Sequence, residues 1–194
     1  MHIEILTGAT LAAALDDLAA LRVAVFRDWP YLYDGEPDYE ARYLENLAQS
    51  DGGLIVGAFD GDRLVGAATG APLLDQHKAF RKPVQESGMP VEEVFYFAES
   101  VLLPDYRGIG LGHAFFDARE DHARQLGYSR ATFCAVIRPK DDPAMPADYR
   151  PLTDFWKKRG YRPLAGVVAY FPWKDVGEDA ETEKPLQFWI GHLS

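Results

Sequence analysis

Cysteine is almost absent from this 194-residue sequence, which contains only Cys134. An intrachain disulfide is therefore excluded, and a reducing compartment is permitted. No apolar run is long enough to cross a bilayer. The first ten residues, MHIEILTGAT, lack a basic segment followed by an apolar one. We therefore expect no signal peptide and take a cytoplasmic location as the default.

Positive charge is also scarce, because 20 Lys and Arg stand against 30 Asp and Glu and the formal net charge is -10. Nucleic acids and anionic membranes attract proteins with an excess of basic residues, so we expect neither as a partner. The acidic balance is compatible with an amine ligand. The five histidines show no H-x-x-x-H spacing, and the sequence predicts no metal site.

Repeats, low-complexity segments and linkers are absent as well, so residues 1–194 are expected to form a single domain. Apolar periodicity and turn signals predict the order β-α-α-β-β-β-α-β-α-β-β, a mixed α/β fold. Residues 75–90 are expected to be a long polar connection with room for one helical turn. The expected strands are 2–6, 53–59, 63–71, 94–103, 131–137, 167–173 and 186–190, and the expected helices are 11–29, 39–48, 109–126 and 152–159.

A glycine-rich segment follows the strand predicted at residues 94–103. Gly108, Gly110 and Gly112 stand where the next helix is expected to begin, directly after Arg107. The start of a helix carries unpaired N–H groups and a partial positive charge, which together favour a phosphate or pyrophosphate. Considered alone, a glycine-rich helix start that binds nothing explains the pattern equally well.

Two common nucleotide motifs do not fit this segment. A P-loop needs Lys followed by Ser or Thr after its last glycine, whereas Gly112 is followed by His113 and Ala114. A dinucleotide motif G-x-G-x-x-G needs glycine where His113 stands, and it belongs near the first strand of a βαβ unit. The first motif is excluded and the second is disfavoured.

Residues 101–112, VLLPDYRGIGLG, closely resemble the acyl-CoA-binding motif of the GNAT superfamily of N-acetyltransferases. That motif is a strand ending in an apolar residue and proline, followed by Arg/Gln-x-x-Gly-x-Gly/Ala. Arg107, Gly110 and Gly112 fill its places without a gap. The family's order of elements matches the order predicted above, and residues 155–161, FWKKRGY, resemble its late short helix. The resemblance implies a GNAT-like fold, with acetyl-CoA as co-substrate.

The resemblance also implies how coenzyme A is held. The pyrophosphate would lie against Arg107 and the backbone amides of five residues, Gly108, Ile109, Gly110, Leu111 and Gly112. In this family strands 4 and 5 separate at a bulge, and their free backbone groups bind the pantetheine arm. Here Val101 and Leu103 would supply those groups, and an N–H near Leu102 would polarise the thioester carbonyl.

Glu99 is the expected general base, because family members often use a carboxylate on strand 4. It lies in an otherwise apolar strand, FYFAESVLL, where burial would raise its pKa. The alternatives are that Glu99 faces solvent or pairs with an arginine in a purely structural role. Ser100 is expected on the opposite face of the strand.

A general acid is harder to assign. Trp156 stands where the family's late helix has a tyrosine, and an indole cannot act as an acid. Tyr149 does not hold the same helical position. Tyr161 and Cys134 are expected to be core residues. A thiolate leaving group also needs no dedicated acid, because its pKa is already near about 8.5.

The acceptor of this fold enters beneath the loop between the first two helices, here DWPYLYDGEPDY. Trp29, Tyr31 and Tyr33 would form aromatic walls and Glu36 would attract a cation, unless these aromatics simply pack inward. Residues 75–90 would cover the acceptor or approach the CoA phosphates. Residues 186–190 are expected to be an exposed strand, through which two copies could pair as a homodimer.

The sequence therefore predicts an N-acetyltransferase that acts on a primary amine of a small molecule or peptide by direct attack in a ternary complex. The alternative is a noncatalytic acyl-CoA-binding sensor or interaction module, which Trp156 favours. The acceptor, the preferred acyl chain, the general acid, the oligomeric state and the role of residues 75–90 stay open.

Overall fold

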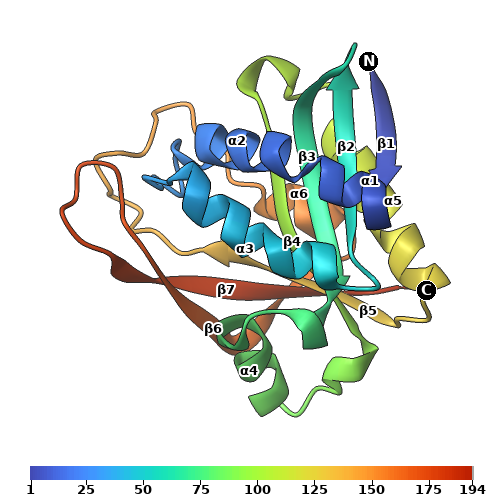
Figure 1. Ribbon diagram of the computed structural model, residues 1–194. Helices are drawn as coiled ribbons and strands as arrows, with labels where there is room; N and C mark the ends of the chain where they lie inside the picture. The colour runs from blue at the N-terminus through green and yellow to red at the C-terminus, as the bar shows by residue number, and fades with distance from the viewer. Residues whose placement is uncertain (194) are drawn as a thin grey trace.

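A computed structural model of the protein describes residues 1–193, with the side chains of all of these except residues 37, 38, 41 and 42. Seven strands of this region form one mixed sheet in the order β1-β2-β3-β4-β5-β7-β6. Figure 1 shows helices on both faces of this sheet. The strands are β1 (His2–Leu6), β2 (Leu54–Asp60), β3 (Arg63–Pro72), β4 (Val94–Leu102), β5 (Arg130–Val136), β6 (Arg162–Trp173) and β7 (Thr182–His192).

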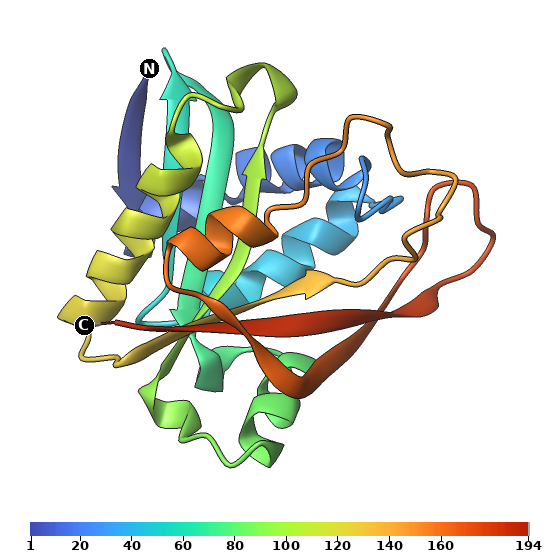
Figure 2. The ribbon, with the colours of Figure 1, turned by 180° about the vertical axis from the view of Figure 1, so that it is seen from behind.

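The helices form two layers. Three of them cover one face of the sheet, where Leu18 and Leu44 pack against Ile55. The other two cover the opposite face, where Phe115 packs against Phe97 (Figure 2). The first layer is α1 (Gly8–Ala13), α2 (Leu15–Phe26) and α3 (Pro37–Gln49), the second is α5 (Leu111–Gln125) and α6 (Thr153–Lys158), and α4 (Lys78–Glu86) lies beside β6.

The predicted mixed α/β order is confirmed, with two differences in the helices. The first predicted helix is divided at Ala14 into α1 and α2. The connection at residues 75–90 contains a full helix, α4, with Phe80 and Val84 buried. These two residues are four positions apart, which is helical spacing, but a single such pair is too short a pattern to predict a full helix. Within residues 1–193, no helix is long and apolar enough to cross a bilayer.

The strand predicted at residues 186–190 is not exposed. It belongs to β7, which is hydrogen-bonded to β5 on one side and β6 on the other. Its backbone groups are therefore used within the sheet, and the expectation that this strand pairs across a dimer is wrong. The order of strands in space depends on contacts that local sequence patterns do not record.

β4 contains a bulge in its pairing with β3. Phe97 lies opposite Gly70 and Ser100 lies opposite Ala68, so the single residue Thr69 faces two residues of β4, Ala98 and Glu99. An extra residue in one strand interrupts the alternation of side chains. Ala98 and Glu99 consequently line the same cavity, on the side of the sheet covered by α2 and α3.

β4 also separates from β5. The two strands are parallel neighbours only where residues 94–96 face residues 130–132. Beyond that point β5 stays paired with β7 as far as Val136, whereas β4 from Phe97 onward has no registered partner on this side. The separation expected from the family resemblance is therefore present, and it begins next to the bulge.

Arg119 of α5 holds the bulge from the opposite face of the sheet. Its side chain is buried, and one Nη donates to the carbonyl oxygens of Thr69 at 3.2 Å and Glu99 at 3.1 Å. The other Nη donates to Ser100 Oγ at 2.9 Å. Burial lowers the pKa of Arg119 to about 10, so the guanidinium is still charged at neutral pH.

We expect Arg119→Met to lower the free energy of unfolding by about 2 kcal/mol, because the carbonyl oxygens of Phe115, Thr69 and Glu99 lose their side-chain donor. Ser100→Ala removes only one of these hydrogen bonds and is expected to cost about 1 kcal/mol. Urea denaturation of the two variants and the parent checks both values. Equal stability of Arg119→Met and the parent would show that the guanidinium does not hold the bulge.

Candidate active site

The glycine turn begins where β4 ends. Gly108 and Gly110 have φ angles of 80° and 95°, and Gly110 is the N-cap of α5. Residues that carry a side chain rarely adopt this left-handed backbone conformation, so the turn requires glycine at these positions. A Cβ atom at either position would meet no atom within 4 Å. The amides at the start of α5 have no acceptor within the helix, and the space beside them is open to a ligand.

Arg107 lies beside this turn. Its Nε donates to the Leu102 carbonyl at 3.0 Å, which places an exposed guanidinium at the end of β4. His113 follows the turn, and its ring packs at 4.9 Å from that of Phe155 in α6. The residues predicted to form an anion cradle therefore meet at one place, whereas His113 packs between helices.

The backbone of Leu103 is already used. Its N–H donates to the Val65 carbonyl at 3.0 Å, and its carbonyl accepts from the Tyr106 N–H at 3.0 Å. Val101 precedes Leu103 by two residues and lies opposite Ala67. Because backbone groups alternate in direction along a strand, those of Val101 also point toward β3. The expectation that Val101 and Leu103 offer free backbone groups is wrong. It chose the set of alternate residues whose backbone groups point toward β3.

Leu102 and Ser100 are the residues whose backbone groups point away from β3 in this register. The Leu102 carbonyl confirms this direction, since it accepts from Arg107 and not from β3. The N–H groups of Ser100 and Leu102 therefore face the separation between β4 and β5. The expectation of an N–H near Leu102 is compatible with this register.

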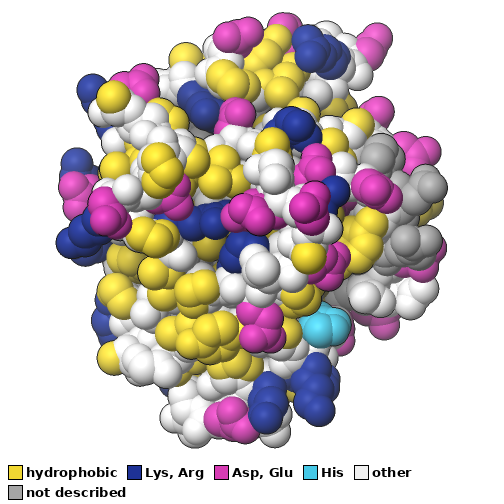
Figure 3. All heavy atoms as spheres, turned by 90° about the vertical axis from the view of Figure 1, so that its left-hand side faces the viewer, with side chains coloured by type: hydrophobic (Ala, Val, Ile, Leu, Met, Phe, Trp, Pro, Cys, Tyr) yellow, Lys and Arg dark blue, Asp and Glu magenta, His cyan; other side chains and the backbone are white. Residues whose placement is uncertain are grey.

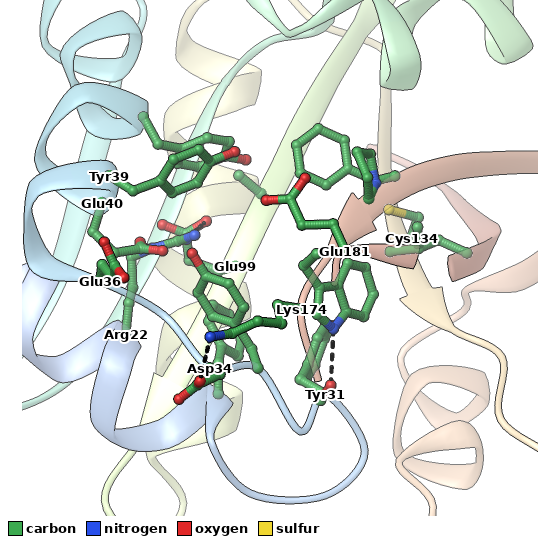
Figure 4. A pocket seen from close by; sticks show the side chains of 18 of the residues that line it. Arg22, Tyr31, Asp34, Glu36, Tyr39, Glu40, Glu99, Cys134, Lys174 and Glu181 are labelled. Atoms are coloured by element: carbon green, nitrogen blue, oxygen red, sulfur yellow. Dashed lines mark hydrogen bonds and ion pairs between the residues drawn. The ribbon is translucent and has the colours of Figure 1, made fainter. Parts of the chain in front are cut away.

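A cavity of about 360 Å³ lies on the side of β4 that α2 and α3 cover. It is enclosed by α2, α3, the bulge of β4, the end of β6 and the loop after it (Figure 4). The loop at residues 28–36 contacts the loop between β6 and β7, where the Asp34 N–H donates to the Lys174 carbonyl at 2.9 Å. Arg138 fastens the same loop, because its Nη donates to the Tyr31 carbonyl and its guanidinium pairs with Asp175 at 2.6 Å.

Two buried carboxylates and one arginine lie at the inner end of the cavity. Arg22 of α2 pairs through Nη1 with Glu99 Oε2 at 2.6 Å and through Nε with Glu40 of α3. Figure 4 shows the charged ends of these three side chains turned toward one another. Burial disfavours the charged form of Arg22, but Glu99 and Glu40 outweigh it and raise its pKa above the usual range. The arginine partner considered for Glu99 is therefore real.

The pairing is incomplete. Glu40 is 0% and Glu99 7% exposed, yet Oε1 of each carboxylate is buried without a hydrogen-bond partner among the described residues. Two negative charges share one positive charge, and a buried oxygen without a donor is costly. This end of the cavity is thus suited to a ligand that donates hydrogen bonds and carries positive charge.

Aromatic rings form the walls. Tyr31 and Tyr33, two of the aromatic residues expected near the acceptor, line the cavity, and Glu36 lies at its exposed rim. Trp29 is not among the lining residues, and its ring packs 6.0 Å from that of Tyr149. Burial raises the pKa values of Tyr31 and Tyr33 above the usual range, so both phenols are neutral at physiological pH.

The late helix carries no tyrosine toward the cavity. Trp156 of α6 packs against Phe133 and Trp189 in the core. Tyr161 is buried, and its hydroxyl donates to Glu120 at 3.0 Å, as expected of a core aromatic. Neither of the two tyrosines considered from the sequence, Tyr149 and Tyr161, lies in α6, so neither occupies the position of the family's late-helix acid.

Most of the lining residues were not predicted from the sequence, among them Arg22, Glu40 and Phe80. Arg22 lies within an apolar helical stripe, and a charged residue in such a stripe was the one available signal. Phe80 shows that the connection at residues 75–90 covers the cavity side. Among the described residues, no group of three or more His, Cys, Asp or Glu could hold a metal ion.

Comparison with known proteins identifies the relatives of this chain. The sequence matches the profile described as the acetyltransferase (GNAT) family over residues 18–161, more than half of the chain. Curated protein sequences gave no significant match.

Solved structures resemble the fold over nearly their whole length. A ribosomal-protein-alanine N-acetyltransferase from Brucella melitensis has 15% identity and a TM-score of 0.61, with 99% of both chains covered. An N-acetyltransferase from Staphylococcus aureus Mu50 has 12% identity and a TM-score of 0.60, with both chains fully covered. An aminoglycoside 6'-N-acetyltransferase in complex with coenzyme A has 17% identity and a TM-score of 0.62, with 100% of this chain and 98% of that chain covered.

The thiol of Cys134 is expected to be unreactive although it lines the cavity. Burial raises its pKa to about 12, while a hydrogen bond with the Tyr96 hydroxyl at 3.0 Å acts in the opposite direction. Because the thiolate is the reactive form, alkylation by iodoacetamide at pH 8 should be about a thousandfold slower than for a free cysteine. The rate should rise about tenfold per pH unit as the thiolate fraction grows. Mass spectrometry measures it, with urea-unfolded protein as the control, and equal rates in both samples would contradict the prediction.

Proposed function

Because the chain belongs to the acetyltransferase (GNAT) family, we propose that it transfers the acetyl group of acetyl-CoA to a primary amine. The reaction proceeds by direct attack of the amine within a ternary complex. The observation that carries this proposal is the bulge of β4, where the buried Glu99 carboxylate meets the cavity. The next residues present their N–H groups to the gap beside β5.

The co-substrate lies between β4 and β5. The amides of residues 108–112, together with Arg107, hold its pyrophosphate at the start of α5. The N–H groups of Ser100 and Leu102 pair with the amide-bearing pantetheine arm, and the one nearest the thioester polarises its carbonyl. The described backbone fits this group, because these donors have no partner in the sheet.

The amine arrives as an ammonium, whose pKa is near about 10, and it must lose a proton before it attacks. Glu99 takes that proton, directly or through water. The nitrogen then attacks the thioester carbonyl, a C–N bond forms and the C–S bond breaks, and the second proton of the nitrogen passes to the departing thiolate or to water. The sulfur leaves as a thiolate, whose pKa near about 8.5 makes a dedicated acid unnecessary. The core packing of Trp156 is consistent with a site that works without one.

A second candidate function is noncatalytic binding of acyl-CoA. The observation that favours it is the absence of an acidic side chain from the place of Trp156 in α6. Acetyl-CoA binding without release of thiol across a panel of primary amines would select this function over catalysis.

We expect Gly110→Asp to abolish the rise in melting temperature that acetyl-CoA causes, because a carboxylate would meet the pyrophosphate. The matched control is Gly110→Asn, which has nearly the same shape, tolerates the positive φ angle and carries no charge. Gly110→Asn should keep a measurable shift. An undiminished shift in Gly110→Asp would remove the glycine turn from the binding site.

Glu99→Gln is expected to lower kcat at pH 7.5 by about a hundredfold, since it removes the base and keeps the hydrogen-bonding shape toward Arg22. The loss should shrink above pH 9, where the amine deprotonates without help. Glu40→Gln alters the same ion-pair network and serves as the matched control, with its effect mainly on KM. Initial rates of CoA release measure both. A kcat of Glu99→Gln that equals the parent value across this pH range would exclude Glu99 as the base.

A further inference from the structure

The inner end of the cavity is built for one positive charge. Among the described residues, Oε1 of Glu40 and Oε1 of Glu99 have no hydrogen-bond partner, although both side chains are more than nine-tenths buried. Their shared partner, Arg22, neutralises one of the two charges. An ammonium at the inner end of the cavity would donate hydrogen bonds to these carboxylates and compensate the remaining charge.

The middle of the cavity is apolar. Phe80, Tyr96 and Trp173 line it with at most 7% of each residue exposed. Tyr43 adds a ring that already lies 4.7 Å from the Arg22 guanidinium. Ring faces and edges of this kind accommodate methylene groups, and they also attract cations. A hydrophilic or branched body would leave its polar groups without partners here.

The rim is acidic and exposed. Glu36, Asp179 and Glu181 line the outer part of the cavity, and Figure 4 shows Glu181 reaching in from the loop that precedes β7. Lys174 is the one basic residue among the described rim residues, and it is paired with Asp34 at 2.9 Å. On the wider face seen in Figure 3, acidic and basic side chains are interspersed. The rim, in contrast, carries more negative than positive charge.

From this arrangement we propose that the acceptor is a linear aliphatic diamine with two positive charges. One ammonium lies against Glu40 and Glu99 and is acetylated, the methylene chain lies between the aromatic walls, and the second ammonium lies among the rim carboxylates. This inference rests on the proposed function and specifies its substrate.

The same charges disfavour two other amines. Free lysine brings a carboxylate to the rim, where Glu36 and Glu181 repel it. A monoamine such as 1-aminobutane fills the inner end but gains nothing from the rim. The preference for a diamine should therefore appear in KM more than in kcat, and it should weaken at high salt because the rim is exposed.

The test compares 1,4-diaminobutane, 1-aminobutane and free lysine in two measurements. The first is the initial rate of CoA release with acetyl-CoA, and the second is the change in melting temperature caused by each amine alone. We expect kcat/KM for the diamine to exceed that for either other amine by about tenfold, and only the diamine to raise the melting temperature measurably. A kcat/KM for free lysine or 1-aminobutane that equals or exceeds the value for the diamine would overturn the proposal.

Rim variants supply the structural control. Glu36→Gln combined with Glu181→Gln should raise KM for the diamine about tenfold, at about threefold per charge, and change KM for 1-aminobutane less than twofold. Glu178→Gln is the matched control, because Glu178 is exposed in the same loop and does not line the cavity. Equal effects of the rim and control variants would contradict the inference.

The outcomes separate this inference from the proposed function. Acetylation of all amines with equal kcat/KM would support the function and overturn the diamine. Binding of the diamine without release of CoA would support the cavity's specificity and overturn the function. Neither binding nor turnover of any amine would overturn both.

Discussion

The pairing of Arg22 with Glu40 and Glu99 is the interaction on which the candidate site depends. It joins α2, α3 and the bulge of β4, three elements that meet nowhere else through charged groups among the described bonds. Burying three charges is expensive, and the Coulombic attraction within the trio offsets that cost only if the geometry is good and the remaining lone pairs find donors. Here Oε1 of Glu40 and Oε1 of Glu99 find no donor among the residues that the structure describes. A cluster that served stability alone would gain from a hydrophobic replacement, so the unsatisfied oxygens are better explained by a ligand. The arginine also limits where a ligand can lie, because it occupies the other oxygen of each carboxylate.

The bulge of β4 is held from both faces of the sheet. On the cavity side Arg22 binds the carboxylate of Glu99, and on the opposite side Arg119 binds its carbonyl oxygen. The bulge therefore has little freedom to slip into the regular register that would turn Glu99 away from the cavity. The pairing of β4 with β5 ends next to the same irregularity, and the proposed function uses both features, the gap for the co-substrate and the Glu99 carboxylate for the acceptor. Both parts of the candidate site meet at the bulge. There β4 directs backbone N–H groups toward β5 and side chains toward the cavity.

The sequence predicted the backbone geometry of the glycine turn better than the arrangement of the cavity, for a physical reason. The glycine turn is a local structure: Arg107 to Gly112 are consecutive, and positive φ angles and an unpaired helix start follow from six residues. The order of strands and helices likewise follows from periodicity. Arg22, Glu40 and Glu99 come together across 77 positions of the chain, and nothing local marks their meeting. The parity of β4 was also unpredictable, because it depends on the register with β3, and the position of β7 between β5 and β6 depends on the assembled sheet.

Net charge illustrates the same limit. A value of -10 describes the whole chain and does not identify a substrate. The folded cavity changes its meaning, because six of its described lining residues are acidic and two are basic, and both basic residues are already paired within the cavity. The acids are also separated by depth: one group is buried beside the bulge, and the other is exposed at the rim with aromatic rings between them. A single charge at the inner end explains why an amine would enter, but it leaves the rim without a role. Two charges separated by an apolar chain give each group a partner, which is why the geometry favours a diamine over an amine in general.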